Sequence, residues 1–77
     1  MSAQARILEL ARSIRSDAWV DFAARGAYSV GFANNADSAT YNKSMEALAA
    51  RLKTEGLKVS TRAADEFHSC TIVTVRA

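Results

Sequence analysis

The sequence contains no proline, one cysteine, one histidine and three glycines in 77 residues. A single cysteine excludes an internal disulfide, and one cysteine with one histidine excludes a zinc module of standard spacing. No run approaches the ~20 apolar residues that span a bilayer, and the first residues lack the basic-then-apolar plan of a signal peptide. We therefore expect a soluble, cytoplasmic protein that uses no metal or cofactor.

A large excess of charge of either sign is also absent. Ten Lys and Arg residues stand against eight Asp and Glu, which gives a net charge of +2. Dedicated DNA-binding domains usually concentrate a larger positive excess on one face, and an acidic mimic of nucleic acid needs a large negative one. The hydrophobic fraction of 49% is too high for a disordered chain. The length predicts one compact domain, 1–77, with a thin core.

The first half of the chain predicts a helix followed by a hairpin. The helix has Ser2 as N-cap, ends near residues 16–17, and carries an apolar stripe of Ile7, Leu10, Ala11 and Ile14. Apolar residues then alternate with polar or small ones in 18–24 and 28–33, around a turn at 25–27. The inner face of this hairpin is expected to hold Val20, Phe22, Val30 and Phe32. Abundant alanine allows a second helix over 17–24 instead, but aromatics and valines at a period of two favour strands.

The second half repeats this order. A polar break precedes a helix from Asp37 or Ser38 to about Glu55, and Gly56 suits the left-handed residue beyond its end. A second hairpin is expected from strands 57–62 and 67–75 with a turn at 63–66. The facing of the last strand is ambiguous, because Cys70 and Ile72 favour one side and Val73 and Val75 the other.

These elements predict an α+β fold of order αββαββ, with one four-stranded, mainly antiparallel sheet and two helices on one face. A shift of 38 residues places the first helix stripe on a matching set, Met45, Leu48, Ala49 and Leu52. Two similar halves, 1–35 and 36–77, would explain this, although any two αββ units share such spacing. In either case the second face of the sheet is expected to stay uncovered.

Reactive side chains are few. His68 and Cys70 lie at i and i+2 of a predicted strand, so an imidazole and a thiol would share one side near Asp65 and Glu66. A nucleophilic dyad needs an orienting partner and an oxyanion hole, and a metal needs three or four ligands. Neither set is visible, and a carboxylate pair in a turn is solvated. We therefore expect no catalytic site and no enzyme activity.

The uncovered face is the candidate binding surface. Trp19, Asp21, Lys58 and Arg62 are the residues expected to contact a partner there, with Ser29 and Ser60 beside them. The alternative for Trp19 is packing under a helix end or in a homodimer contact. A second candidate is a basic surface on the first helix, made by Arg6, Arg12 and Arg15, whose alternative is an ordinary solvated helix face.

A non-catalytic protein-binding module is the function that these features favour. In size and in lacking an assembled site the chain resembles small inhibitors of host machinery from phages and mobile elements, anti-CRISPR proteins among them. A nucleic-acid-binding domain that uses the open sheet face or the helix arginines is the alternative; the chain is loosely similar to RNA-recognition domains, but its element order differs. Pairing of edge strands also predicts a homodimer.

Overall fold

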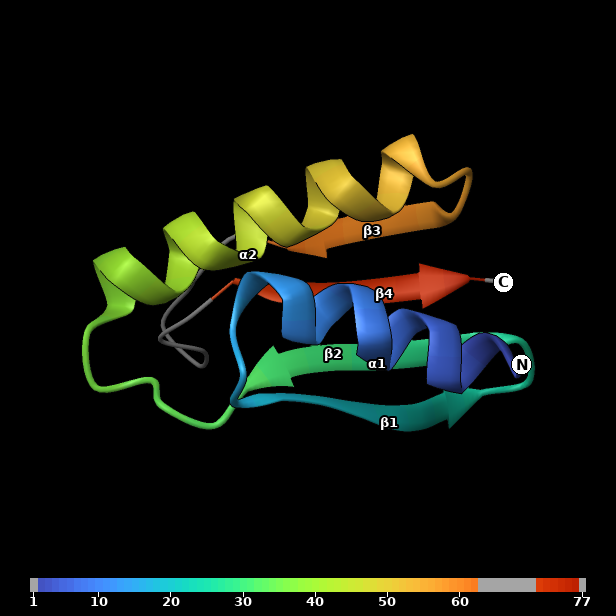
Figure 1. Cartoon of the computed structure of the whole chain (residues 1–77), viewed down its shortest axis with the longest axis horizontal. Coiled ribbons are helices and arrows are strands. Elements are labelled where there is room, and N and C mark those ends of the chain that lie inside the picture. Colours follow the sequence, from blue (N-terminus) through green and yellow to red (C-terminus); the bar gives the residue numbers. More distant parts are fainter. Residues whose placement is uncertain (1, 63–70, 77) are drawn as a thin grey trace.

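The strands and helices alternate in two αββ units that share one sheet (Figure 1). The computed structural model describes residues 2–62 and 71–76. The elements are α1 (Ala3–Ile14), β1 (Ala18–Ala24), β2 (Ala27–Phe32), α2 (Ser38–Thr54), β3 (Lys58–Arg62) and β4 (Ile72–Arg76). All strand pairs are antiparallel, in the order β1-β2-β4-β3, which confirms the predicted fold class.

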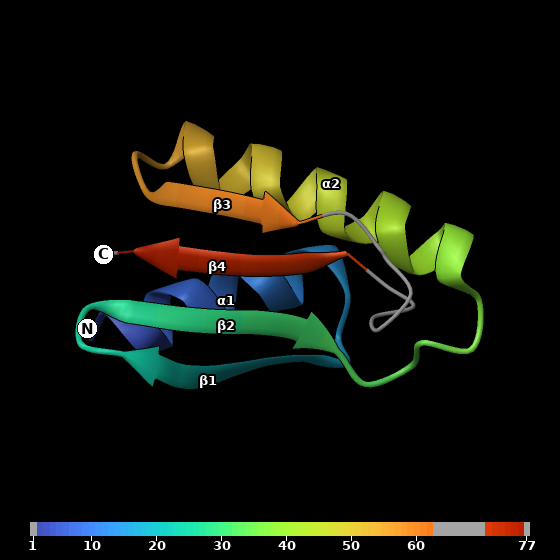
Figure 2. The same cartoon turned by 180° about the vertical axis from the view of Figure 1, so that it is seen from behind.

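Both helices cover the same face of the sheet, and Figure 2 shows the opposite face with no helix over it. α1 lies over β1, α2 lies near β3, and the two helices also contact each other. β2 and β4 form the centre, so each hairpin contributes one central and one edge strand. This arrangement gives the chain one covered and one open sheet face.

Local signals set the helix boundaries. The Ser2 hydroxyl accepts a hydrogen bond from the first turn of α1, at 3.1 Å. At the start of α2, the Asp37 carboxylate accepts hydrogen bonds from the Thr40 hydroxyl (2.6 Å) and from the Ala39 backbone (3.1 Å). Gly56, at φ +85°, follows the end of α2 in the left-handed region that favours glycine. Each helix therefore begins where its sequence signal predicts.

The core lies between the helix stripes and the central strands. Val20, Val30 and Phe32 face it as the alternating pattern predicts. The other members of the buried cluster are Ile7, Ala11, Ala18, Tyr41, Met45, Leu48, Leu52, Val73 and Val75.

Phe22 departs from the prediction. Its side chain was expected in the core, but 67% of it is exposed. It pairs with Tyr28 on the helix-facing side, and the rings meet edge to face with centroids 6.4 Å apart. The strand register shifts just after Phe22, at the end of an edge strand. The alternating pattern therefore predicted the correct face of the sheet for Phe22. The prediction that Phe22 is buried in the core was wrong.

The chain forms strands over 18–24, so the helical alternative is wrong there. β4 resolves the ambiguous facing, because Val73 and Val75 are fully buried against the helices. Ile72 is half-buried on the other side. The predicted turn at 63–66 and the expected strand start at 67–70 lie outside the described residues.

Side chains from α2 complete one end of the β2–β4 ladder. The Phe32 backbone N–H donates to the Tyr41 hydroxyl (3.3 Å), and the Thr71 N–H donates to Asn42 Oδ1 (2.7 Å). The Phe32 and Tyr41 rings also meet edge to face, with centroids 5.6 Å apart. These bonds satisfy backbone donors beyond the last pairs of the ladder, where a buried orphan N–H would be costly.

Candidate partner-binding surface

The strand register defines which side chains point away from the helices. We call this surface the open face. Its polar, charged and large apolar side chains are Trp19, Asp21, Ser29, Lys58, Ser60, Arg62, Ile72, Thr74 and Arg76. The four residues predicted to bind a partner all belong to it.

The open face has two separated ends and does not form one cluster. Trp19 and Asp21 lie on β1, whereas Lys58 and Arg62 lie on β3 at the opposite edge. Two central strands lie between them, a separation of about 14 Å at ordinary strand spacing. Lys58 pairs directly with Arg76 of β4, which places two cations side by side. Arg76 was not among the residues expected to bind a partner, although the alternation of Val73 and Val75 places it on this face.

A polar row crosses the middle of the open face. Asp21 pairs with Ser29, Ser29 with Thr74, and Thr74 with Ser60. Short hydroxyl side chains of this kind leave the backbone accessible and bind through hydrogen bonds. The open face therefore combines an aromatic end, a polar centre and a basic edge.

Trp19 is the exposed large apolar side chain among the described residues of the open face, and its exposed fraction is 41%. It pairs with Gly31 across the β1–β2 hairpin, and its ring occupies the space beside the Gly31 Cα. A Cβ added at Gly31 would lie 2.8 Å from Trp19 Cε2 and 2.9 Å from the Tyr41 hydroxyl oxygen. The indole is thus held on the sheet surface by a contact that a larger residue at position 31 would prevent.

The three arginines of the proposed basic surface each bind another part of the chain. Arg6 donates to the Glu55 carbonyl (3.2 Å) and carboxylate (3.4 Å), which links α1 to the end of α2. Arg12 Nε lies 3.5 Å from the Ala18 carbonyl oxygen of β1. Arg6 and Arg12 therefore contact other elements of the protein, although both side chains remain exposed at its surface.

Arg15 is the most engaged of the three. Its guanidinium binds both carboxylate oxygens of Asp17, at 2.7 and 3.0 Å, and donates to the Asn34 carbonyl at 3.0 Å. It also lies over the Phe32 ring, 4.6 Å from the centroid. Arg15 thus joins the α1–β1 turn to the end of β2, and it does not form one patch with Arg6 at the far end of α1.

Asp17 completes this cluster. Its carboxylate accepts a hydrogen bond from the Asn34 N–H at 2.9 Å as well as the two from Arg15. The Asn34 hydrogen bond, followed by the Arg15 interactions, holds the pKa of the Asp17 carboxyl below its ordinary value. The cluster therefore depends on an ionised Asp17.

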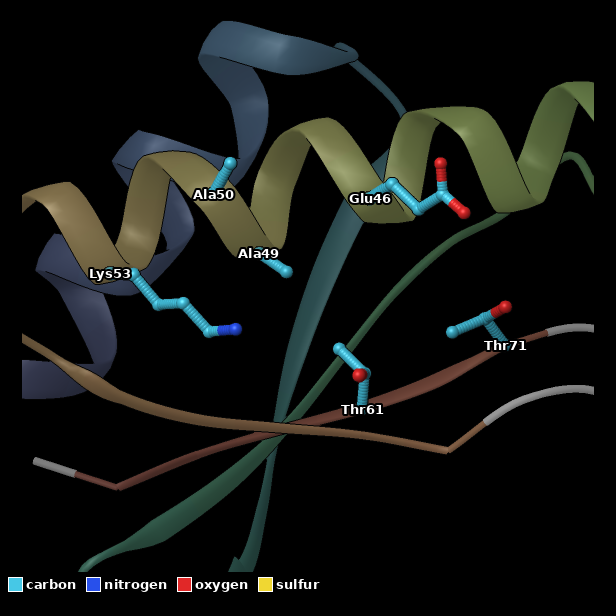
Figure 3. A pocket seen from close by; sticks show the side chains of 6 residues that line it. All are labelled: Glu46, Ala49, Ala50, Lys53, Thr61 and Thr71. Atoms are coloured by element: carbon cyan, nitrogen blue, oxygen red, sulfur yellow. The ribbon is translucent and has the colours of Figure 1, made fainter.

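A groove separates α2 from the edge strand β3 (Figure 3). Its volume is about 370 Å³, and it is lined by Glu46, Ala49, Ala50, Lys53, Thr61 and Thr71. Figure 3 shows Ala49 and Lys53 reaching down from the helix, with Thr61 and Thr71 on the strand side. The groove was not expected from the sequence, because its lining residues come from separate segments of the chain and form no local sequence pattern.

The predicted reactive residues His68, Cys70, Asp65 and Glu66 lie outside the described residues. Within residues 2–62 and 71–76, no three His, Cys, Asp or Glu side chains come together as metal ligands would. In the same part of the chain, no helix is both long and apolar enough to cross a membrane.

Comparison with protein-family models, curated protein sequences and solved structures found no match to this chain.

Proposed function

We propose that this chain is a non-catalytic protein-binding module that meets its partner through the open face. The observation that carries the proposal is the exposed Trp19 on a sheet face that neither helix covers. Tryptophan is favoured among the residues that dominate binding energy at protein interfaces. Contact with Gly31 fixes the indole before binding, so little side-chain freedom is lost when a partner covers it.

Asp21 favours a protein partner over a nucleic acid. It lies two residues from Trp19 on the same face of β1, and the structure gives it no ion pair among the described residues. A base stacked on Trp19 would bring its phosphates toward this carboxylate, and the two negative charges would repel. A protein surface can instead place a cation or a hydrogen-bond donor there.

Nucleic-acid binding is a second candidate function because two cationic side chains are paired across neighbouring strands. Lys58 and Arg76 lie directly opposite each other on β3 and β4, and both are exposed. Such a pair suits phosphate groups. Retention on immobilised single-stranded DNA and RNA at increasing salt tests this candidate, because phosphate binding falls steeply with salt.

The biological setting that we propose is inhibition of host machinery by a phage or another mobile element, in the cytoplasm. A chain of this size can act by occupying a surface of a larger protein. Affinity capture from host lysate treated with nuclease, followed by binding measurements with the purified captured protein, tests the proposal. A homodimer is a separate prediction, which sedimentation at micromolar concentration checks.

The decisive variant is Trp19→Ala. It should weaken partner binding by about 2 kcal/mol or more. Phe22→Ala is the matched control, because Phe22 is an even more exposed aromatic of the same strand, on the opposite side of the sheet. Denaturant unfolding of both variants separates lost binding from lost stability. If the Trp19→Ala variant remains folded and binds like the wild type, the proposed surface is wrong.

A further inference from the structure

The two edges of the sheet are protected differently. The Ala33 N–H donates to the Asp17 carbonyl at 3.0 Å, so the backbone groups of residue 17 point inward to β2. Because this direction alternates along a strand, those of Ala18 and Val20 point to the free edge. Their carbonyl oxygens lie near Arg12 Nε (3.5 Å) and Gln4 Nε2 (3.4 Å) from α1. Two side chains of α1 therefore reach outward-pointing carbonyl oxygens of β1.

β3 has no equivalent cover among the described residues. In that part of the chain, no side chain from α2 donates to the backbone of residues 58–61, and β3 pairs on one side only, with β4. The 38-residue shift between the helices explains the difference. It places Asn42 at the position of Gln4 and Ala50 at that of Arg12. Asn42 binds the Thr71 N–H instead, and Ala50 has no polar atom.

The groove lies between α2 and the end of this strand, where Thr61 is the β3 residue that lines it. α2 passes over β3 with the small side chain of Ala49 directed toward the strand, and the groove between them has a volume of about 370 Å³. Thr61 enters it from β3, on the helix-facing side of the strand. A strand added to β3 would direct alternate side chains into this space. The edge thus offers backbone groups that no described strand pairs, beside a pocket for side chains.

We propose that the outer edge of β3, at residues 58–61, receives an extended, acidic segment of the partner protein as a fifth strand, with an apolar side chain of that segment in the groove under α2. The inference rests on the proposed protein-binding function and adds a second contact to it. Backbone pairing supplies affinity in this mode, and the groove supplies specificity.

The charges of the edge define the occupant. Lys53 of α2 and Lys58 of β3 lie near the start of the strand, both are exposed, and neither forms an ion pair with another described residue. An Asp or Glu of the added strand would meet these cations. A second copy of this chain fits less well, because full antiparallel pairing centred on Ser60 sets Lys58 of each copy opposite Arg62 of the other.

A displayed library of random peptides, selected on the immobilised full chain, tests the proposal. The enriched peptides should alternate apolar residues with others, carry Asp or Glu, and bind the purified wild-type protein in solution. Thr61→Tyr fills the groove from β3 and should weaken this binding about tenfold or more. Ala39→Tyr is the control, since position 39 is exposed in the first turn of α2, outside both the groove and the open face.

A second pair of variants tests the charge. Lys53→Glu should also weaken binding of the acidic peptides, whereas Lys43→Glu, an exposed change elsewhere on α2, should leave it unchanged. Circular dichroism and denaturant unfolding establish that each variant is folded. If Thr61→Tyr fails to fold, amide hydrogen exchange of the wild type decides, because a bound strand must protect the amides of Val59 and Thr61, which point away from β4.

The remaining outcomes separate this inference from the proposed function. Enriched peptides that lose affinity with Trp19→Ala but not with Thr61→Tyr would overturn the edge site and support the open face alone. No enrichment, or enrichment of basic peptides, would overturn the edge site too. A dimer in sedimentation that Thr61→Tyr abolishes would assign the edge to a second copy.

Discussion

The ring of Trp19 occupies the space beside Gly31 that a side chain at position 31 would need. Glycine weakens a strand, because it has no side chain to pack and more freedom to lose. A cross-strand aromatic that covers the glycine offsets this weakness. The exposed tryptophan and the buried glycine are therefore one structural feature. Trp19 has a role in the fold as well as in the proposed interface, and any test of binding must separate the two.

Gly31→Ala should destabilise the protein by about 1–3 kcal/mol, since the new Cβ would overlap the indole and crowd the Tyr41 hydroxyl. Displacement of the indole should shift the fluorescence of Trp19, the single tryptophan, toward that of a solvated ring. Urea unfolding measures the first effect and emission spectra the second. Ser29→Ala, two residues away on the same face, should change neither; unchanged stability of Gly31→Ala would contradict the contact.

Tyr41→Phe should cost about 1–3 kcal/mol, because it leaves the buried Phe32 N–H without an acceptor while keeping the ring contact. Thermal and urea unfolding measure the loss. Tyr28→Phe is the control, since the structure gives the half-buried Tyr28 hydroxyl no hydrogen bond among the described residues. Equal stability of the two variants would show that Tyr41 contributes through its ring alone.

The sequence was sufficient for the architecture, because helix stripes, caps and strand alternation are local signals. Ser2, Asp37 and Gly56 act where their chemistry predicts. The exposure of Phe22 depends on how far the helices extend over the sheet, which alternation does not encode. The same limit applies to the site. The alternating pattern predicted that Trp19 and Lys58 lie on the same face of the sheet. The distance between them depends on the strand order, which the pattern does not encode.

Stability should fall in acid through Asp17. Its pKa is lower in the folded protein than the ordinary aspartate value of about 3.9, so its stabilising contribution is complete above that pH and is lost as the pH falls through the folded value. Urea midpoints at neutral pH and near pH 3 measure this. Asp17→Asn should reduce the neutral-pH stability and flatten the pH dependence. Asp37, whose pKa is lowered chiefly by the Thr40 hydroxyl, contributes in the same direction.

The outcome for Asp17→Asn is judged against Asp21→Asn, in which the replaced carboxylate has no ion pair among the described residues. This comparison isolates the charge removed from the Arg15–Asp17 cluster. If the stability of all three proteins changes equally with pH, the ionisation of Asp17 in the Arg15–Asp17 cluster is not coupled to folding.

Lys58→Glu should stabilise the protein by about 0.5 kcal/mol, because it replaces a directly opposed pair of cations with an ion pair to Arg76. Arg76→Glu should do the same for the same reason. The double variant should return to the wild-type value, since two carboxylates then face each other. Urea unfolding of the four proteins gives the coupling energy, and additive effects would contradict this strand register.

The β2–β4 pairing has a consequence for how the chain folds. Each hairpin joins strands close in sequence, whereas Val30 and Val73 meet across more than half of the chain. Closing such a long loop has a high entropic cost before its contacts form, and non-local pairing slows folding. We expect the hairpins to form early and the central seam late, so that the rate-limiting barrier lies in bringing the two halves together.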